Sequence, residues 1–510
     1  MIPVSASYNP FPQVRRVGFL ATFKLVDLHA NDNSTMSTSS ASPVSRLDQV
    51  LDDIQVPSGR FASLEPNLWL LDGSMRCIDT DRTGEQVGWW SAWLSQQDRT
   101  FYSAAIPFVQ FTFSAPVSSF GFTLNFDGES GAPPAEVVTR TYSGETLLDT
   151  KTDTCSGSTI IIEMPTENYD KVVFNFTKSS FPKRRVRLTE CVFGIVKTYD
   201  STNLSKASLS YEANPTAESL PSRQLNLTID NSKREYNMRN PDSIYAYLQD
   251  GQEIRVRCSI GGELIDMGRF HFTSASAKDG GVTAVLKAND RIYSWDDAAY
   301  SPGEHHGKIV SLSVAVAEVL TGRGINCQYA PNLADRLVRL SPPKDSSIRD
   351  VIRLLAQAAR CTAWIDRADN LRFEDLSVSS SAVQLYGFDD MYDADSISIR
   401  DKVGKVTVNA TRVDTDSEGV YYTYGDGEEG KTVSNPCVEP GSGSAVAEWI
   451  FGHCQKRVKY KFRNRCDPAV EIGDTVSVAD TFGDPGLALI TGIDLAYNGG
   501  LSAVNEGVGS

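Results

Sequence analysis

The chain has 510 residues, of which 41% are hydrophobic and 22% are charged. It is therefore too apolar for a disordered protein and long enough for about three or four domains. Its net charge of −15 argues against a general nucleic-acid surface or a surface for anionic membranes, while leaving room for a narrow basic lining inside a pore.

The cysteines and the N-terminus favour synthesis in a reducing cytoplasm. The nine cysteines are scattered and include no CxxC pair, which argues against a zinc ribbon and against a secreted disulfide framework. We expect them to be small, buried thiols. The start, MIPVSASYNPFPQVRR, lacks the apolar core of a signal peptide, and no run approaches the roughly 18 apolar residues of a membrane span.

The first part of the chain is predicted to be all-β. Residues 14–29 alternate well enough for one or two strands, and the Ser/Thr-rich residues 31–45 are expected to form a long loop or linker. From 61 to 196, alternating segments are separated by Gly, Pro, Asn or Asp about every 8–15 residues. This pattern is typical of an antiparallel β-sandwich.

The second part is predicted to be β-rich with one mixed segment. Strands are expected in 198–300 and again from 377 onward, where one helix at 444–460 interrupts them. Between them, 301–376 is expected to hold two helices and a hairpin whose turn is Arg367–Asn370.

The N-terminal strands need a partner elsewhere. Residues 14–60 are too few and too Ser-rich to bury a core of their own. We therefore expect the strands at 14–29 to pair with strands from 198–300, which makes the sandwich an insertion.

Residues 425–432, GDGEEGKT, match the pattern of a phosphate-binding P-loop. A real P-loop leads into a helix, but Pro436 and Pro440 break any helix here, and the loop carries three carboxylates that repel phosphate. We expect an exposed acidic hairpin loop that binds no nucleotide.

Metal and hydrolase signatures are weak. Residues 414–419 resemble the start of an EF-hand loop, but its twelfth position is Gly425, so a solvated turn is favoured and only weak calcium binding stays open. No paired histidines have zinc spacing, and no G-x-S-x-G occurs. Paired catalytic carboxylates cannot be recognised, because their separation is a tertiary property. We expect no cofactor, no metal site and no catalytic residue.

Trp89, Trp90 and Trp93 form an aromatic cluster on the predicted sandwich. Aromatic faces can stack on sugars, which makes these residues candidates for sugar binding. Core packing or a protein interface is the commoner use of tryptophan.

Several segments, read in order, resemble siphophage tail-tip proteins of the hub or tail-associated class. These proteins are related in fold to contractile-phage baseplate hubs and to late control D proteins. The segments that carry the resemblance are 61–74 with 88–91, then 220–221, 225–231, 240–252, 268–270 and 288–291, then the unit at 308–374, and finally 467–468, 471–474 and 498–501.

The resemblance implies a mainly β, multidomain fold. Two tube-like β-barrels flank a small α+β unit, and a galactose-binding-like β-sandwich is inserted. The implied divisions are 1–60 (N-terminal strands and Ser-rich linker of the first hub barrel), 61–196 (the sandwich), 197–300 (the first barrel continued), 301–376 (the two-helix α+β unit) and 377–510 (the second barrel with one helix).

The resemblance also implies a function. The chain would be a late, non-enzymatic virion protein that forms a homotrimeric hub at the tail tip, or baseplate, and closes the tail tube. Its partners would be the distal tail protein ring, the tape measure protein and, in some tails, a fibre or receptor-binding protein. DNA would pass through a channel with an acidic or neutral wall, without specific binding. A hydrolase or fibre module often follows such hubs; we expect none here, since Ser510 follows the last barrel directly.

Two other functions stay open from the sequence. In the first, the chain is a receptor- or carbohydrate-binding tail protein whose 61–196 sandwich binds a host surface glycan. It can also be a cell-wall-degrading tail enzyme. The sequence does not distinguish an infectious phage from a tail-like particle.

Overall fold

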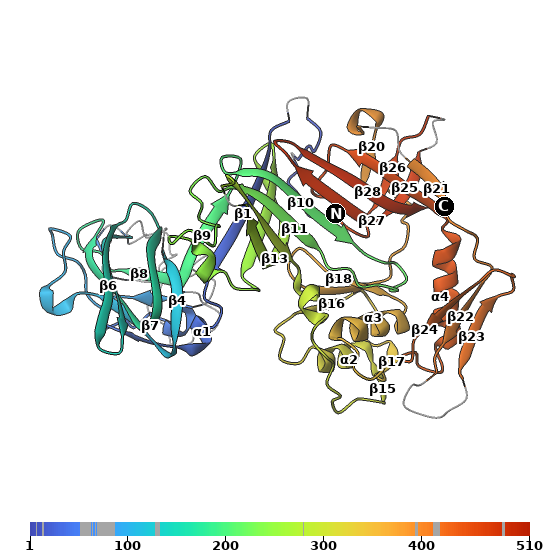
Figure 1. Cartoon of the computed structure of the whole chain (residues 1–510), viewed down its shortest axis with the longest axis horizontal. Helices are drawn as coiled ribbons and strands as arrows, with labels where there is room; N and C mark the ends of the chain where they lie inside the picture. Colours follow the sequence, from blue (N-terminus) through green and yellow to red (C-terminus); the bar gives the residue numbers. More distant parts are fainter. Residues whose placement is uncertain are drawn as a thin grey trace. The chain divides into compact units, whose positions relative to one another are not determined.

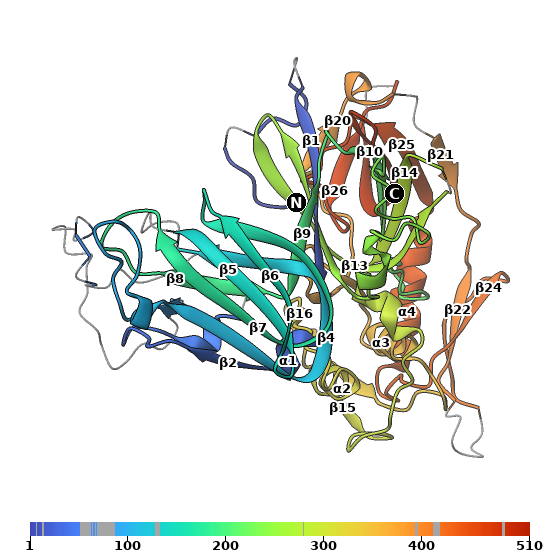
Figure 2. The ribbon, with the colours of Figure 1, turned by 60° about the vertical axis from the view of Figure 1, so that its left-hand side comes forward.

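The computed structural model shows a mainly β chain with two compact units (Figures 1 and 2). Unit 1 is Met1–Thr22, Thr198–Asn237 and Glu253–Ser510, and unit 2 is Phe23–Lys197 and Met238–Gln252. The expected fold class, mainly β and multidomain, is confirmed. The structure describes residues 1–6, 8–12, 15–51, 63, 65, 66, 68, 87–127, 133–278, 280–392, 396–411, 419–481 and 485–509.

Unit 2 contains a seven-stranded antiparallel sheet around a core rich in phenylalanine. Its strands are β2 (Ser34–Thr38), β3 (Trp89–Trp90), β4 (Phe108–Phe126), β5 (Pro134–Ser143), β6 (Thr146–Thr154), β7 (Thr159–Ser179) and β8 (Arg187–Val192). They lie in the order β3-β8-β4-β7-β5-β6, with β2 on β4. The register of β4 with β7 shifts between Thr112 and Gly121, so one half of β4 pairs with β2 and the other with β8.

Short helices complete the described part of unit 2. They are α1 (Ala30–Asn33), η1 (Leu47–Gln49), η2 (Ser103–Ala105) and η3 (Ile244–Tyr247). The prediction of a loop at 31–45 is wrong for its first half, which forms α1 and β2. The polar segment becomes a strand because β4 offers it a backbone partner and because Met36 packs against the core.

Unit 1 is built on a 13-stranded sheet to which the two ends of the chain both contribute. The N-terminal and middle strands are β1 (Val17–Val26), β9 (Gly194–Tyr199), β10 (Leu204–Glu212), β11 (Gln224–Asp230), β12 (Glu253–Ile260), β13 (Glu263–Ala277) and β14 (Thr283–Asn289). The C-terminal strands are β20 (Gln384–Tyr386), β21 (Ser396–Ile399), β25 (Val458–Asn464), β26 (Thr475–Val478), β27 (Gly486–Tyr497) and β28 (Leu501–Gly509).

The main strand order is β21-β25-β28-β27-β10-β11-β14-β13-β12-β1-β9, and β26 pairs with β27 and β20. β1 lies between β12 and β9, so the pairing of the N-terminal strand with a strand from 198–300 is present. β1 begins in unit 1 and ends in unit 2, and β9 leads back.

Residues 301–376 hold the expected two helices and hairpin. η4 (Arg291–Trp295) precedes this segment. Its elements are β15 (Ile309–Ser311), α2 (Leu312–Val319), β16 (Cys327–Tyr329), β17 (Leu337–Arg339), α3 (Ile348–Ala358), β18 (Thr362–Ile365) and β19 (Leu371–Glu374). The first helix begins at Leu312 because the preceding residues pair with β17. The Ser347 hydroxyl accepts a hydrogen bond from the Asp350 N–H and caps α3.

The remaining elements lie between β20 and β25. They are η5 (Phe388–Asp390), β22 (Lys405–Asn409), β23 (Tyr421–Gly425), β24 (Gly430–Ser434) and α4 (Gly443–Gln455). A strand, not a helix, follows the P-loop-like residues, so the backbone of a phosphate cradle is absent there. The expected hairpin is wrong in detail, because β23 and β24 both pair with β22 rather than with each other. Residues 414–418 of the EF-hand-like segment lie outside the described residues.

The eight cysteines that the structure describes are free thiols, five of them buried. Cys77 lies outside the described residues. None of the described helices is long and apolar enough to cross a membrane.

Candidate functional site

The two halves of unit 1 are joined by the antiparallel pair β10 and β27, here called the β10–β27 joint (Figure 1). Leu209 lies opposite Leu495, and both side chains are buried. Ser210 lies opposite Asp494 on the other face, and its hydroxyl donates a 2.6 Å hydrogen bond to that carboxylate. The joint therefore makes one sheet with an apolar side and a polar side.

The polar side continues across seven strands, because directly paired residues of antiparallel strands point to the same face. The shared polar face is defined by the outward side chains of β25, β28, β27, β10, β11, β14 and the second half of β13. Its members include Lys459, Lys461, Arg463, Ser502, Glu506, Asp494, Ala496, Lys206, Ser208, Ser210, Glu212, Gln224, Asn226, Thr228, Asp230, Lys287, Asn289, Ser274 and Ser276.

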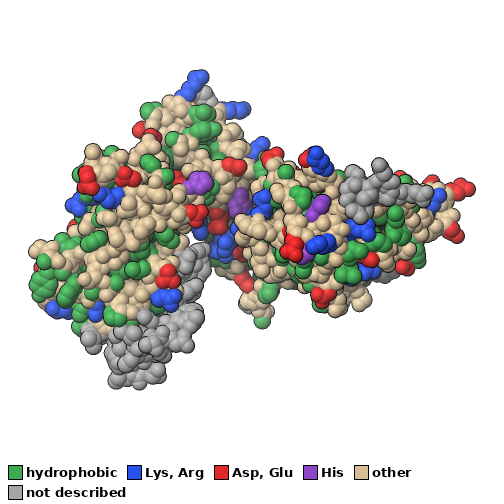
Figure 3. Space-filling view, turned by 90° about the horizontal axis from the view of Figure 1, so that it is seen from below, with side chains coloured by type: hydrophobic (Ala, Val, Ile, Leu, Met, Phe, Trp, Pro, Cys, Tyr) green, Lys and Arg blue, Asp and Glu red, His purple; other side chains and the backbone are tan. Residues whose placement is uncertain are grey.

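Charges on the shared polar face nearly cancel. Five members are lysine or arginine and four are aspartate or glutamate, and the rest are mostly Ser, Thr, Asn and Gln. Glu506 accepts from Lys461 at 2.8 Å and pairs with Lys459 at 3.2 Å. The hydrogen bond from Lys461 holds the pKa of the Glu506 carboxyl below its usual range. In the view of Figure 3, basic and acidic side chains are scattered over the surface without a large patch of either sign.

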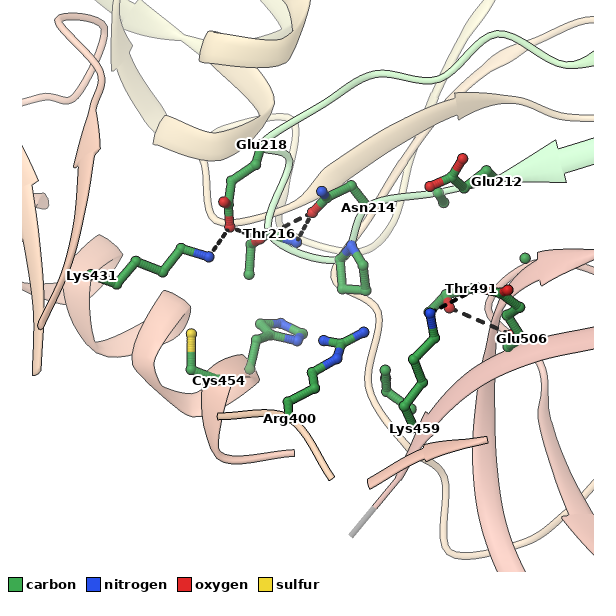
Figure 4. Close-up of a pocket in the computed structure, with 15 residues that line it drawn as sticks. Glu212, Asn214, Thr216, Glu218, Arg400, Lys431, Cys454, Lys459, Thr491 and Glu506 are labelled. Atoms are coloured by element: carbon green, nitrogen blue, oxygen red, sulfur yellow. Dashed lines mark hydrogen bonds and ion pairs between the residues drawn. The ribbon is translucent and has the colours of Figure 1, made fainter. Parts of the chain in front are cut away.

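A pocket of about 270 Å³ lies at one end of the shared polar face, beside Glu212 (Figure 4). Lys431 donates to Glu218 at 2.6 Å, and Lys459 pairs with Glu506, so two of its three lysine and arginine side chains are matched by carboxylates. Burial raises the pKa of the Cys454 thiol, which keeps this sulfur protonated and a poor nucleophile. Among the described residues, no group of three or more His, Cys, Asp or Glu could hold a metal ion.

A buried ion pair lies beneath the shared polar face. The Asp290 carboxylate accepts from the Arg223 N–H at 3.0 Å, from the Ser222 hydroxyl at 2.7 Å and from the Ile292 N–H at 3.1 Å. The Arg223 guanidinium pairs with it at 3.4 Å and lies 5.1 Å from the centre of the Phe270 ring. Burial raises the pKa of Asp290, and Arg223 opposes that rise. The pair fixes the segment before β11 to the end of β14.

The structure separates the three candidate tryptophans of unit 2. Trp89 is fully buried and lies 5.9 Å from Phe176, whereas Trp90 is buried with Arg187 3.8 Å over its ring. Arg187 is itself buried and pairs with Glu65 and Asp127. Of the three, only Trp93 presents a largely exposed ring, with 56% of its surface open.

Two further aromatic side chains lie on loops bonded to the Trp93 loop. Tyr102 and Phe181 are 62% and 54% exposed. The Ser95 N–H donates to the Arg184 carbonyl and the Ser95 hydroxyl to the Phe181 carbonyl, while the Gln96 N–H donates to the Thr100 carbonyl. The loops that carry Trp93, Tyr102 and Phe181 are called the aromatic loops below.

Residues 183–185 form a basic run. Arg184 donates to the Pro66 carbonyl, and Arg185 donates to the carbonyls of Ser63 and Ser91 in the same unit. Two of its three cationic side chains thus hold loops of unit 2 together through hydrogen bonds, a role that the sequence does not reveal.

Comparison with known proteins gives no match to a family model or to a curated protein. Among solved structures, the tail protein from Neisseria meningitidis is similar over 61% of this chain and 93% of its own, with 13% identity and a TM-score of 0.46. Solved structures that are similar to this chain also include prophage tail proteins. A 43 kDa prophage tail protein from Shewanella oneidensis shares 16% identity over 61% of this chain and 95% of its own, with a TM-score of 0.44.

The expected resemblance to phage tail proteins is thus confirmed as a likeness. A GH31 CBM32-2 module bound to GalNAc is also similar, over 33% of this chain and 97% of its own, with 17% identity and a TM-score of 0.20. Because these TM-scores are below 0.5, the function proposed below rests on the geometry of this chain.

Proposed function

We propose that the chain is a non-enzymatic structural protein of a phage tail and forms the hub of the tail tip. In this proposal, copies of unit 1 close into a ring whose shared polar faces line a central channel. The observation that carries the proposal is the β10–β27 joint, which fuses two β-rich halves into one sheet with a polar side. Such a face suits a passage, because small polar side chains hydrate well and offer no apolar patch.

The dimensions favour three copies. The path from β21 to β13 contributes eight antiparallel strands per copy. At about 4.8 Å per strand, three copies give a circumference of about 115 Å and a backbone diameter of about 37 Å, which strand tilt widens. Stacked sheets lie about 10 Å apart and fill that gap with two layers of side chains, so one layer is roughly 5 Å thick. With one such layer on each side, the channel still leaves room for duplex DNA. Two copies would give about 24 Å, which is too narrow.

The near-neutral charge of the shared polar face suits a channel that DNA crosses without stopping, because basic surfaces bind phosphates through counterion release. We expect the double variant Glu506→Lys/Asp494→Lys, with seven basic and two acidic side chains on the face, to bind duplex DNA at least about 10-fold more tightly at low salt. Its affinity should also fall more steeply with salt in a fluorescence titration.

The matched control for this charge change is Glu145→Lys/Asp149→Lys, which alters two exposed carboxylates at β6 of unit 2. We expect this variant to bind DNA less tightly than the face variant. Equal affinities would show that net charge, and not the shared polar face, governs contact with DNA.

In the proposed hub, the chain contacts the distal tail protein ring, the tape measure protein and, where present, a fibre or receptor-binding protein. Synthesis takes place in the host cytoplasm, and the final location is the tail tip of the virion. The test is electron microscopy of particles in which this chain carries a fused label. Three labels around the tail axis at the tip are expected; a peripheral position, or one or six copies around the axis, would overturn the hub. Absence of clearing on a cell-wall zymogram is the expected result for a non-enzyme.

The aromatic loops favour a second candidate function, in which unit 2 binds a host surface glycan. Exposed aromatic rings supply the flat apolar faces on which sugars stack. If this function holds, Trp93→Ala should weaken binding to galactose-type glycans on an array by at least about 10-fold, equal to 1.4 kcal/mol. The control Leu147→Ala removes an exposed apolar side chain from β6 of the same unit and should leave binding unchanged. A parent chain that binds no glycan would end this candidate.

A further inference from the structure

Several described strands have an unpaired edge, and two of them, β21 and the end of β13, bound the eight-strand path of the shared polar face. β21 is the first strand of the sheet path and pairs only with β25. β13 pairs with β12 only up to His271, so Thr273–Ala277 is open on that side, while Ser274–Ala277 pairs with β14 on the other side. Open edges of this kind present free backbone N–H and C=O groups and invite another strand.

Both edges carry the same two-faced pattern as the β10–β27 joint. On β21, Ser396 and Ser398 lie opposite Lys461 and Lys459 of the shared polar face, while Ile397 lies opposite the buried Tyr460. On β13, Ser274 and Ser276 lie on the polar face. The side chains of Ala275 and Ala277 face the apolar side, opposite Leu286 and Ala284.

The apolar side is left uncovered at β21. Ile397 is 52% exposed and Ile399 is 69% exposed, although both point to the side of the sheet that is buried elsewhere. Exposed β-branched residues on a sheet edge are costly to leave in water and are typical of an interface. Ala275 and Ala277 are also only partly buried, and their small side chains leave space for larger partners.

Strand direction agrees with pairing of these two edges. All seven neighbouring pairs between β21 and β13 are antiparallel, so the two outer strands of this eight-strand path run in opposite directions. Copies related by rotation about an axis along the strands keep their strand directions. β13 of one copy therefore meets β21 of the next copy antiparallel, as β10 meets β27 within one chain.

We propose that β21 of one copy adds to Thr273–Ala277 of the next copy, which continues the shared polar face from chain to chain. The occupant of each edge is thus a second copy of this chain, and the contact is heterologous and closes into a ring. This inference rests on the proposed hub and names its subunit contact. Ile397 of β21 then covers Ala275 of β13, while serines from both strands extend the polar face.

Cysteine cross-linking in assembled particles tests the contact. The double variant Ser274→Cys/Ser398→Cys places one exposed thiol on each edge. A second double variant, Ser276→Cys/Ser396→Cys, places its thiols two residues along each strand in the same antiparallel register. A short bismaleimide should link copies into a ladder that ends at three chains on a denaturing gel, and each single variant should stay at one chain. The control Ser398→Cys/Thr423→Cys keeps the thiol on β21 and moves the other to the exposed Thr423 of β23; it should not give the ladder.

The outcomes separate the contact from the hub. Particles with three labelled copies on the tail axis but no cross-links in either pair would overturn the β13–β21 contact and leave the hub standing. Absence of the chain from the tail axis would overturn the hub itself. A cross-linked ladder that ends at another number would support the contact and reject the trimer.

A second variant tests the contact without cysteines. Ile399→Lys puts a charge on the exposed edge, which blocks strand addition while sparing the monomer. We expect at least a 10-fold loss of the chain from purified particles. Leu264→Lys is the matched control, because Leu264 is a 58% exposed apolar residue in the part of β13 that already pairs with β12. Equal incorporation of the two variants would contradict the contact.

Discussion

Replacing Asp290 with alanine is expected to destabilise unit 1 by about 3–5 kcal/mol, the usual cost of stranding a buried charge. The substitution removes the acceptor of three hydrogen bonds and leaves the Arg223 guanidinium without its carboxylate. Hydrogen exchange followed by mass spectrometry measures this loss of stability as faster amide exchange in peptides from β11 and β14.

Two controls define this result. Glu212→Ala removes an exposed carboxylate from the same sheet and should change the stability of unit 1 by less than about 0.5 kcal/mol, as is usual for surface substitutions. Peptides from β4 and β7 of unit 2 should exchange as in the parent. Unchanged exchange in β11 after Asp290→Ala would show that the buried pair does not hold this end of the sheet.

The second large effect is expected at the β10–β27 joint. Leu209→Ala and Leu495→Ala should each cost about 2–5 kcal/mol, because each removes a fully buried side chain and leaves a cavity. Since the two residues are direct cross-strand partners, the double variant should cost less than the sum, with a coupling of at least about 0.5 kcal/mol.

Urea unfolding of the four chains measures this cycle, with hydrogen exchange assigning the transition to unit 1. Leu209→Ala with Leu227→Ala is the comparison pair, since Leu227 lies in the same sheet on β11, opposite Ala207 rather than Leu209. Additive costs at Leu209 and Leu495 would mean that the two halves of unit 1 are not coupled through this contact.

Local patterns in the sequence predicted much of the fold. Alternation located most strands, and apolar residues at helical spacing located the second helix of 301–376, which is α3. The breakdown of the P-loop pattern could be predicted as well, because the prolines after Lys431 leave no room for a helix.

Long-range features could not be predicted in this way. The β10–β27 joint pairs Leu209 with Leu495, and no local pattern specifies which strand edge meets which. The polar β2 looks like a linker because its strand character comes from the edge of β4. Trp89 and Trp90 are adjacent, yet both are buried, because Trp89 faces the Phe-rich core while Val44, Val87 and Arg187 cover Trp90. Their position in the sequence therefore does not distinguish them from the exposed Trp93.

The path of the chain through β1 and β9 has a consequence for evolution and for engineering. The chain leaves along β1 and returns along the neighbouring β9, and the Asp27 N–H donates to the Phe193 carbonyl where the two strands part. A module whose two ends lie side by side can be exchanged for another module, or for a tight turn, without altering the sheet that receives it. Recombination can thus exchange the segment between β1 and β9 as a cassette, and a reporter domain with adjacent termini can be grafted at the same place.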